Sequence, residues 1–310
     1  MSAKTALLTG LAAALVATLA GCSTASAPAE AGSAGPTSKV IEVVAAENFW
    51  GSIAEQLGGN RVKVTDIINN PDADPHDYEP TAADGRAIAT ADMVLINGIG
   101  YDVWATKLAD ANPNPARTEL TVGELVGVAD GGNPHRWYNP DDVQKVVDQI
   151  VTDYQTIDPA DSAYFDTQKT AFENTATADY KAVIADIKAR YAGTPVGASE
   201  SIFAMIAPAL GLDLLTPPDF LKAISEGTDP TAADKATIDA QIKDKKIKVY
   251  VYNSQNATPD VQRQVDEAKA AGIPVSTITE TMTPATDSWQ QWQTAQLVAL
   301  RDALAKATGL

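Results

Sequence analysis

Short apolar runs alternate along the chain with longer segments in which apolar residues recur at helical spacing. The runs of strand length cover residues 40–45, 62–68, 93–97, 125–128, 195–198, 247–252 and 273–278. Such alternation is typical of a parallel α/β architecture. Several of the runs are apolar on both faces, as expected of a sheet that helices cover on both sides. We therefore expect an α/β fold.

Two helix starts are marked by capping residues. Thr81 is placed to cap a helix that extends through Ala91, and Asn139 followed by Pro140 is typical of the start of another. The second helix carries its apolar residues on one face, namely Val143, Val146, Val147, Ile150, Val151 and Tyr154. Both helices begin shortly after a histidine in the sequence.

The stretch from Pro159 to Tyr191 has no Gly or Pro after Pro159 and repeats apolar residues at helical spacing. Gly193 and Pro195 end it. A helix of some 30 residues would be about 45 Å long, more than one small domain needs. We interpret it as a connecting spine over residues 159–192, between an N-terminal lobe (39–158) and a C-terminal lobe (193–310).

The N-terminal segment is typical of an exported protein. Lys4 precedes an apolar region at residues 7–19 that is too short to span a bilayer. The sequence Leu-Ala-Gly-Cys at 19–22 resembles the lipobox of bacterial lipoproteins, in which the chain is cut before the cysteine and the thiol is lipidated. This predicts a lipoprotein signal peptide at 1–21 and lipidated Cys22; the alternative is an ordinary thiol near a plain secretory cleavage site.

Residues 22–38 are small, polar and interrupted by Pro, so they cannot bury enough apolar surface to order themselves. We expect a disordered tether that holds the folded part to the outer face of the cell membrane. The lipid anchor would then be the protein's contact with the membrane.

The composition excludes several classes of function. The 310 residues carry 23 basic and 40 acidic side chains, and the net charge of -17 would repel nucleic-acid phosphates. One Cys allows neither an internal disulfide nor a site of several thiolates. No HExxH, GxSxG or P-loop pattern occurs.

The only two histidines, His76 and His135, each follow a proline within a loop, and a capped helix begins a few residues later. Either one alone also fits a solvated loop residue. Two histidines in similar settings make a pair of metal ligands an equally good interpretation, because a stiff loop aims the imidazole before the ion arrives.

The surrounding segments, residues 74–81 (DPHDYEPT) and 133–140 (NPHRWYNP), resemble the two histidine motifs of the solute-binding lipoproteins of zinc and manganese ABC transporters, the cluster A-I group. Asn133 stands where Asp is common in that family. The resemblance covers nearly the whole mature chain. It implies two similar lobes bridged by a long helix, with a metal ion in the cleft between them and two ligands from each lobe.

The same resemblance implies the other two ligands. Glu200 occupies the position of the third ligand, which is His in many zinc binders, and Glu280 follows a late strand at the position of the fourth. Each Glu alone also fits a solvated loop acid. All four residues, His76, His135, Glu200 and Glu280, follow the carboxyl end of an expected strand, the edge at which open α/β sheets bind ligands.

We therefore expect a monomeric, lipid-anchored, extracytoplasmic receptor, not an enzyme, that captures Zn²⁺ or Mn²⁺ and delivers it to an ABC permease. A carboxylate is a harder ligand than imidazole, so Glu200 in place of a third His shifts the relative preference of the site toward Mn²⁺. A site of nitrogen and oxygen ligands still binds Zn²⁺ more tightly than Mn²⁺. The alternatives are a metallohydrolase that uses the same ligands and an adhesin-type surface lipoprotein.

Overall fold

Two four-stranded parallel sheets form the core of the structure, a computed structural model that describes residues 39–71, 73 and 78–310. The first sheet has the order β2-β1-β3-β4 and consists of β1 (Ile41–Glu47), β2 (Val62–Ile68), β3 (Met93–Ile96) and β4 (Thr118–Thr121). The second has the order β6-β5-β7-β8 and consists of β5 (Pro195–Ala198), β6 (Asp213–Leu214), β7 (Val249–Asn253) and β8 (Val275–Ile278). The α/β fold is therefore confirmed, whereas Cys22 and His76 lie outside the described residues.

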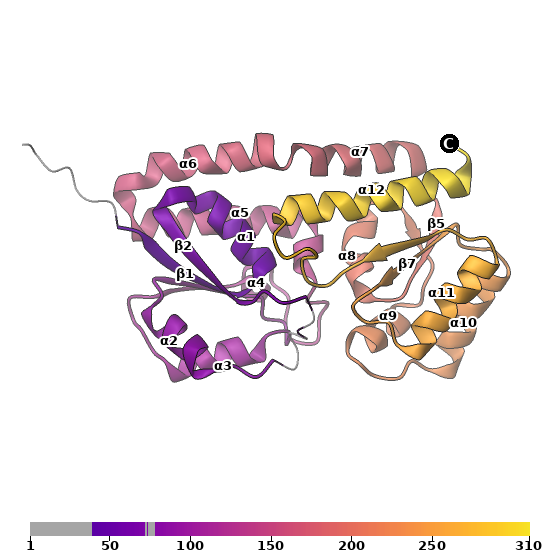
Figure 1. The fold of residues 1–310 in the computed structure, drawn as a ribbon, viewed down its shortest axis with the longest axis horizontal. Coiled ribbons are helices and arrows are strands. Elements are labelled where there is room, and N and C mark those ends of the chain that lie inside the picture. The colour runs from indigo at the N-terminus through magenta and orange to yellow at the C-terminus, as the bar shows by residue number, and fades with distance from the viewer. Residues whose placement is uncertain (1–38, 72, 74–77) are drawn as a thin grey trace, which may run out of the picture. The chain divides into compact units, whose positions relative to one another are not determined.

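Helices cover both faces of each sheet (Figure 1). Those of the first half are α1 (Asn48–Gly58), α2 (Ala82–Thr90), α3 (Val103–Ala111), α4 (Val122–Val126) and α5 (Pro140–Ile157). Those of the second half are α8 (Ser201–Leu210), α9 (Pro218–Ser225), α10 (Ala232–Lys243) and α11 (Pro259–Ala270). Alternate residues of β1 enter different cores, because Val43 and Ala45 face α1 and α5 while Val44 packs toward α2 and α3.

The two predicted helix starts are confirmed. The Thr81 side chain accepts hydrogen bonds from the backbone N–H groups of Ala83 and Asp84, and Asn139 caps α5 in the same way. Each cap satisfies backbone donors that have no partner within the helix. The caps therefore fix where the chain turns from the preceding loop into the helix.

The predicted strand at residues 125–128 is wrong. That segment contains the end of α4, which Gly127 terminates in the left-handed conformation at φ 72°. Its apolar run is too short to distinguish a strand from a helix by pattern alone. The fourth strand of the first sheet is β4, a polar edge strand whose side chains are mostly not buried. His135 therefore does not follow a strand by a short loop.

The spine is not one continuous α-helix. It consists of α6 (Ser162–Ala171), a π-helical turn (Phe172–Ala176) and α7 (Ala178–Tyr191), with Thr177 N–H donating to Phe172 O five residues earlier at 3.0 Å. Such a turn inserts one residue into the helical ladder without needing Gly or Pro, so the sequence carried no sign of it. The two segments run across both sheets within residues 39–310 (Figure 1).

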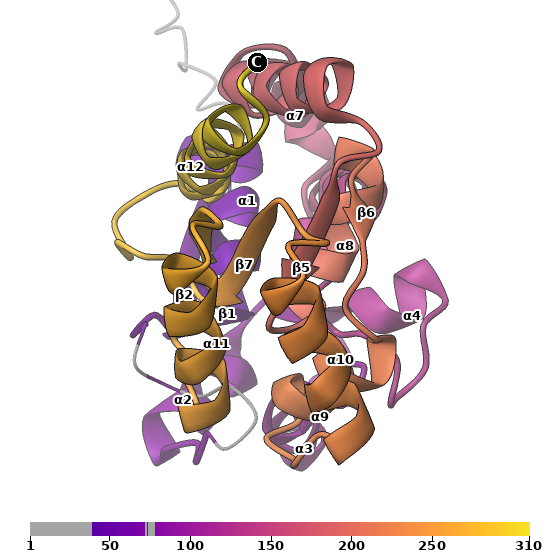
Figure 2. The same cartoon turned by 90° about the vertical axis from the view of Figure 1, so that its right-hand side faces the viewer.

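The last helix, α12 (Trp289–Thr308), lies beside α7 in both views (Figures 1 and 2). The first turn of α12 also contacts α1 in the first half of the chain. Trp289 N–H donates to Ser52 Oγ at 3.0 Å, and the amides of Gln56 and Gln290 exchange two hydrogen bonds. Within the described part of the chain, no helix is long and apolar enough to cross a membrane.

Candidate metal centre

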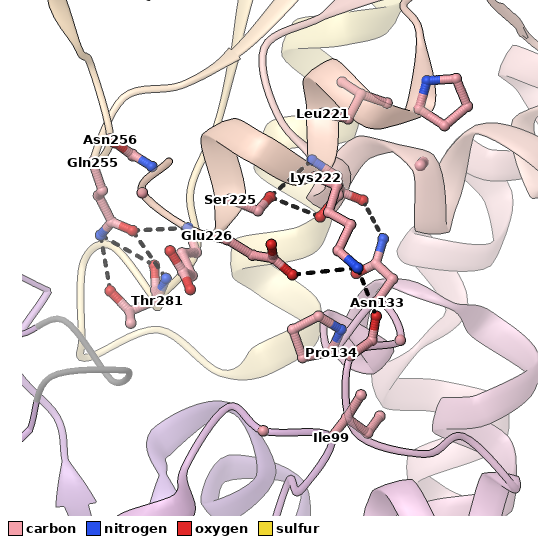
Figure 3. A pocket seen from close by; sticks show the side chains of 18 of the residues that line it. Ile99, Asn133, Pro134, Leu221, Lys222, Ser225, Glu226, Gln255, Asn256 and Thr281 are labelled. Carbon is pink, nitrogen blue, oxygen red and sulfur yellow. Dashed lines mark hydrogen bonds and ion pairs between the residues drawn. The ribbon is translucent and has the colours of Figure 1, made fainter. Parts of the chain in front are cut away.

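A cavity of about 990 Å³ lies where loops at the carboxyl ends of the two sheets meet. The first half contributes Ile99, Asn133 and Pro134, and the second contributes Ser201, Asn256 and Glu280. Figure 3 shows Asn256, Gln255 and Thr281 on one side of this cavity and Asn133 and Pro134 on another. Parallel sheets bind ligands at this edge, so the cavity is the candidate site.

His135 is held in a defined orientation by its own loop. The side chain is 1% exposed, and Nδ1 lies 2.8 Å from Asn133 Oδ1, which also accepts the His135 backbone N–H at 3.1 Å. Because an amide oxygen only accepts, the proton is assigned to Nδ1 and the lone pair to Nε2. Asn133 thus orients the imidazole as a carboxylate would at this position.

Two further residues, Asn97 and Trp137, contact the His135 loop. Asn97 Nδ2 donates to Pro134 O at 3.0 Å, and the Trp137 ring lies edge-on to the imidazole with centroids 5.2 Å apart. Trp137 is 0% exposed and stacks on Phe49 at 3.9 Å. This tryptophan is therefore both a core residue and one wall of the site.

Glu280 approaches His135 from the second half of the chain. Its Oε1 lies 3.7 Å from His135 Nε2, so the lone pair of the imidazole and a carboxylate oxygen face one region. Burial and the nearby Glu280 charge hold the pKa of the Tyr101 phenol well above its usual value. Tyr101 therefore keeps its proton beside the carboxylate.

The backbone of Glu280 is tied across the two halves. Gln255 Oε1 accepts the backbone N–H groups of Glu280 and Thr281 at 2.8 and 2.9 Å. The Nε2 of the same glutamine donates to Pro71 O at 3.1 Å. Gln255 thus joins the loop after β8 to the loop after β2.

Glu200 is a buried carboxylate, 2% exposed, that precedes α8. Asn253 Nδ2 and Asn256 Nδ2 each donate to one of its oxygens at 2.6 Å. Each oxygen keeps a second lone pair with which it can bind a cation. The next residue, Ser201, has its Oγ 3.3 Å from His135 Nδ1. Glu200 therefore lies next to the pair formed by His135 and Glu280.

The structure thus brings His135 and Glu280 together, with Glu200 next to them. Across residues 39–71, 73 and 78–310, no three His, Cys, Asp or Glu side chains gather closely enough to hold a metal ion. The four-ligand set therefore remains a prediction. Glu200 and Glu280 do follow strands by short loops, namely β5 and β8.

Sequence reasoning missed three buried polar residues near this edge. Asp102 accepts the backbone N–H groups of Asn97 and Gly98 at 2.6 and 2.7 Å, and burial raises its pKa to about 6. Tyr101 and Glu47 are fully buried beside it. Glu47 could have been noticed as an acid that ends the apolar run of β1, a place where acids are rare.

The profile of the family ZnuA, zinc-uptake complex component A periplasmic, matches residues 43–303 of the chain. The manganese-binding lipoprotein MntA of Halalkalibacterium halodurans is 30% identical over 38% of this chain and 40% of its own length. The iron-binding protein YfeA of Yersinia pestis is 27% identical over 56% of this chain and 58% of its own length. The chain therefore spans about half the length of these curated relatives.

A solved structure has the same fold. The Mn-bound periplasmic metal binding protein from Candidatus Liberibacter asiaticus superposes with a TM-score of 0.71 at 18% identity. The match covers 85% of this chain and 99% of that one. At this identity the likeness establishes the fold alone.

Proposed function

The chain belongs to the ZnuA family, and we propose that it is an extracytoplasmic receptor that captures Zn²⁺ or Mn²⁺ and delivers it to an ABC permease. The observation that carries this proposal is the pair formed by His135 Nε2 and Glu280 Oε1, 3.7 Å apart at the cavity. The two residues come from different halves of the chain, which suits a cation bound between them.

The proposed ligands are His76, His135, Glu200 and Glu280. Two neutral imidazoles and two carboxylates together balance the charge of a divalent ion, so that ion could be buried with little net charge. Asn133 fixes the tautomer of His135, and Asn253 and Asn256 fix the carboxylate of Glu200. The binding atoms are therefore largely oriented before the metal arrives.

Binding is proposed as the whole role of the site. The two curated relatives described above are named as metal-binding proteins, and the family is one of uptake components. Catalysis would need an open coordination position with an activated water and a further acid or base. The hydrolase and adhesin alternatives gain no specific support from the described residues.

The proposal is tested by the metal content of the protein purified without chelator. We expect about one equivalent of a divalent transition metal, removed by a strong chelator and restored by Zn²⁺ or Mn²⁺. Isothermal titration of the stripped protein would measure both affinities. A stripped protein that binds neither ion, although its circular dichroism shows it to be folded, would refute the receptor proposal.

Glu200 is expected to set the preference between the two ions. We predict that the wild-type protein binds both, with Zn²⁺ tighter, because a given N/O site follows that intrinsic order. Glu200→His should widen the gap in favour of Zn²⁺, since imidazole suits Zn²⁺ better than Mn²⁺. Competition titrations on both proteins measure the ratio, and an unchanged ratio would remove Glu200 from the ligand set.

Membrane attachment is proposed to depend on Cys22. Cys22→Ser should leave the protein soluble or unprocessed, because the acyl chains would be its hold on the membrane. Cell fractionation with immunoblotting checks this. If the processed serine variant still sediments with membranes, attachment has another cause and the lipobox interpretation is wrong.

A further inference from the structure

The loop that leads to His135 is bound to the second half of the chain by two side chains. Lys222 of α9 donates from Nζ to Gly131 O at 3.2 Å, and Asn133 donates from Nδ2 to Ser201 O at 2.7 Å. Figure 3 shows Lys222 and Asn133 on the same side of the cavity. Both contacts join the first half to the second, so this loop is one of the places at which the halves are held together.

The Asn133 amide uses its two ends in opposite halves of the chain. Its Oδ1 accepts the backbone N–H of His135 at 3.1 Å and lies 2.8 Å from the imidazole Nδ1. A backbone N–H only donates and a backbone carbonyl only accepts, so these partners assign the oxygen to the His135 side and the nitrogen to the Ser201 side. One planar group thus orients a proposed metal ligand and binds the opposite half.

The two contacts together require an amide at position 133. An aspartate there would have acceptor oxygens only, so it could hold the His135 ring but would place an oxygen against the Ser201 carbonyl. Asn133 stands where Asp is common in the family that the histidine motifs resemble. The contact with Ser201, which an aspartate cannot form, gives that departure a physical role.

The carbonyl that accepts this bond is fixed beside another proposed ligand. Ser201 follows Glu200 directly, its backbone N–H donates to Ser225 Oγ at 3.1 Å, and its own Oγ lies 2.7 Å from that hydroxyl. Asn256 Nδ2 donates to Glu200 Oε1 at 2.6 Å and to Ile224 O at 3.2 Å. Because Ile224 and Ser225 end α9, the end of this helix supports both the carboxylate and the carbonyl.

We propose that Asn133 is a positioning residue that couples the orientation of His135 to closure of the two halves over the cavity, and thereby slows release of the bound ion. This inference rests on the proposed function, in which His135 and Glu200 bind one ion from opposite halves. Both side chains are buried, at 1% and 2% exposed, so an ion between them leaves only when the halves move apart. That movement breaks the bond from Asn133 to Ser201, which therefore adds to the barrier against release.

The test is Asn133→Asp, which keeps an oxygen toward His135 and replaces the donor toward Ser201 with an acceptor. We expect Zn²⁺ to leave this variant about fivefold faster or more, the effect of losing one hydrogen bond. If Asn133 acted on the imidazole alone, the charged acceptor would hold Nδ1–H more firmly and release would not accelerate. Stopped-flow mixing of the Zn²⁺-loaded full protein with a fluorescent chelator measures the rate.

The state of the imidazole is measured separately by nuclear magnetic resonance. The chain has 2 histidines, so selective ¹⁵N labelling gives two imidazoles, and His135→Ala identifies which signals belong to His135. Above the pH range in which histidine titrates, we expect the proton on Nδ1 of His135 in metal-free wild type and in Asn133→Asp, because both supply an acceptor. Faster release with an unchanged tautomer assigns the effect to the contact with Ser201.

Gln56→Ala is the matched control. The Gln56 amide also joins the two halves, through hydrogen bonds with the Gln290 amide at 3.1 and 2.7 Å, but neither of these two residues lines the cavity. Zn²⁺ should therefore leave Gln56→Ala at the wild-type rate. Acceleration equal to that in Asn133→Asp would reflect general loosening of the halves and would overturn the role of Asn133.

Three further results would also overturn that role. One is a wild-type rate of Zn²⁺ release from Asn133→Asp, which leaves the receptor function standing as long as the wild-type protein binds Zn²⁺. Another is a changed His135 tautomer in Asn133→Asp, which would attribute faster release to the imidazole. Should Asn133→Asp not fold, Ser225→Ala removes the support of Ser201 and leaves the Asn133–His135 contact intact, and a wild-type rate in that variant is the third. A wild-type protein that binds no Zn²⁺ would instead refute the receptor function together with this inference.

Discussion

Replacing His135 with alanine is expected to lower the affinity for Zn²⁺ and Mn²⁺ by more than about a hundredfold, because partners that merely orient a ligand already contribute 10- to 100-fold. His135 presents Nε2 3.7 Å from Glu280 Oε1, and no other described nitrogen ligand stands there. The metal-free variant should stay folded, since the residue belongs to a loop between elements. Isothermal titration and a thermal melt measure the two properties.

Asn133→Ala provides a graded comparison for His135→Ala. It keeps the imidazole but removes the oxygen that accepts Nδ1–H at 2.8 Å, so the ring loses its fixed tautomer and orientation. We expect an intermediate loss of affinity, about 10- to 100-fold. Wild-type affinity in His135→Ala would contradict the proposed site. Binding should also weaken as the pH falls, because protons compete with the metal for imidazole nitrogens.

Trp137→Ala is expected to cause the largest loss of stability near the site. The side chain is 0% exposed, stacks on Phe49 with ring centroids 3.9 Å apart and lies tilted against Tyr101 with centroids 5.2 Å apart. Truncation leaves a large cavity and should cost about 3–5 kcal/mol, which lowers the melting temperature by roughly 10 °C. Metal affinity should fall as well, because the imidazole of His135 loses one wall.

Phe165→Ala separates the two effects of the Trp137 substitution. Phe165 is 0% exposed within α6 and packs on Tyr154 and Tyr164, among residues with no part in the cavity. Its loss should lower stability by a similar amount, about 3–5 kcal/mol, and leave metal affinity unchanged at temperatures where the protein is folded. If both variants lose affinity equally, Trp137 acts through stability alone.

The elements that the sequence predicted correctly are those with an unambiguous pattern. The strands at 62–68 and 195–198 have the predicted ends, and the caps at Thr81 and Asn139 form as expected. The fourth strand was misplaced because Thr118–Thr121 is a polar edge strand, while the apolar residues after it belong to a short helix. Whether a strand lies at the edge of a sheet depends on which strands pair with one another. The local sequence pattern does not show that pairing.

For the site, the resemblance of the histidine motifs to a known family led to His135, Glu200 and Glu280, which the structure places at or beside one cavity. The burial of Glu47 at this edge was not predicted from the sequence, although Glu47 ends the apolar run of β1. Its surroundings come from distant segments, since Asp102 follows β3 and Glu280 follows β8.

The path of α12 bears on how the chain reaches its native state. This helix ends the sequence, yet its first turn bonds to Ser52 and Gln56 of α1, and Trp289 Nε1 donates to Trp137 O at 3.2 Å. The surface of the first half is thus completed by residues synthesised more than two hundred positions later. These contacts of the first half can therefore form only after the C-terminal helix has been synthesised.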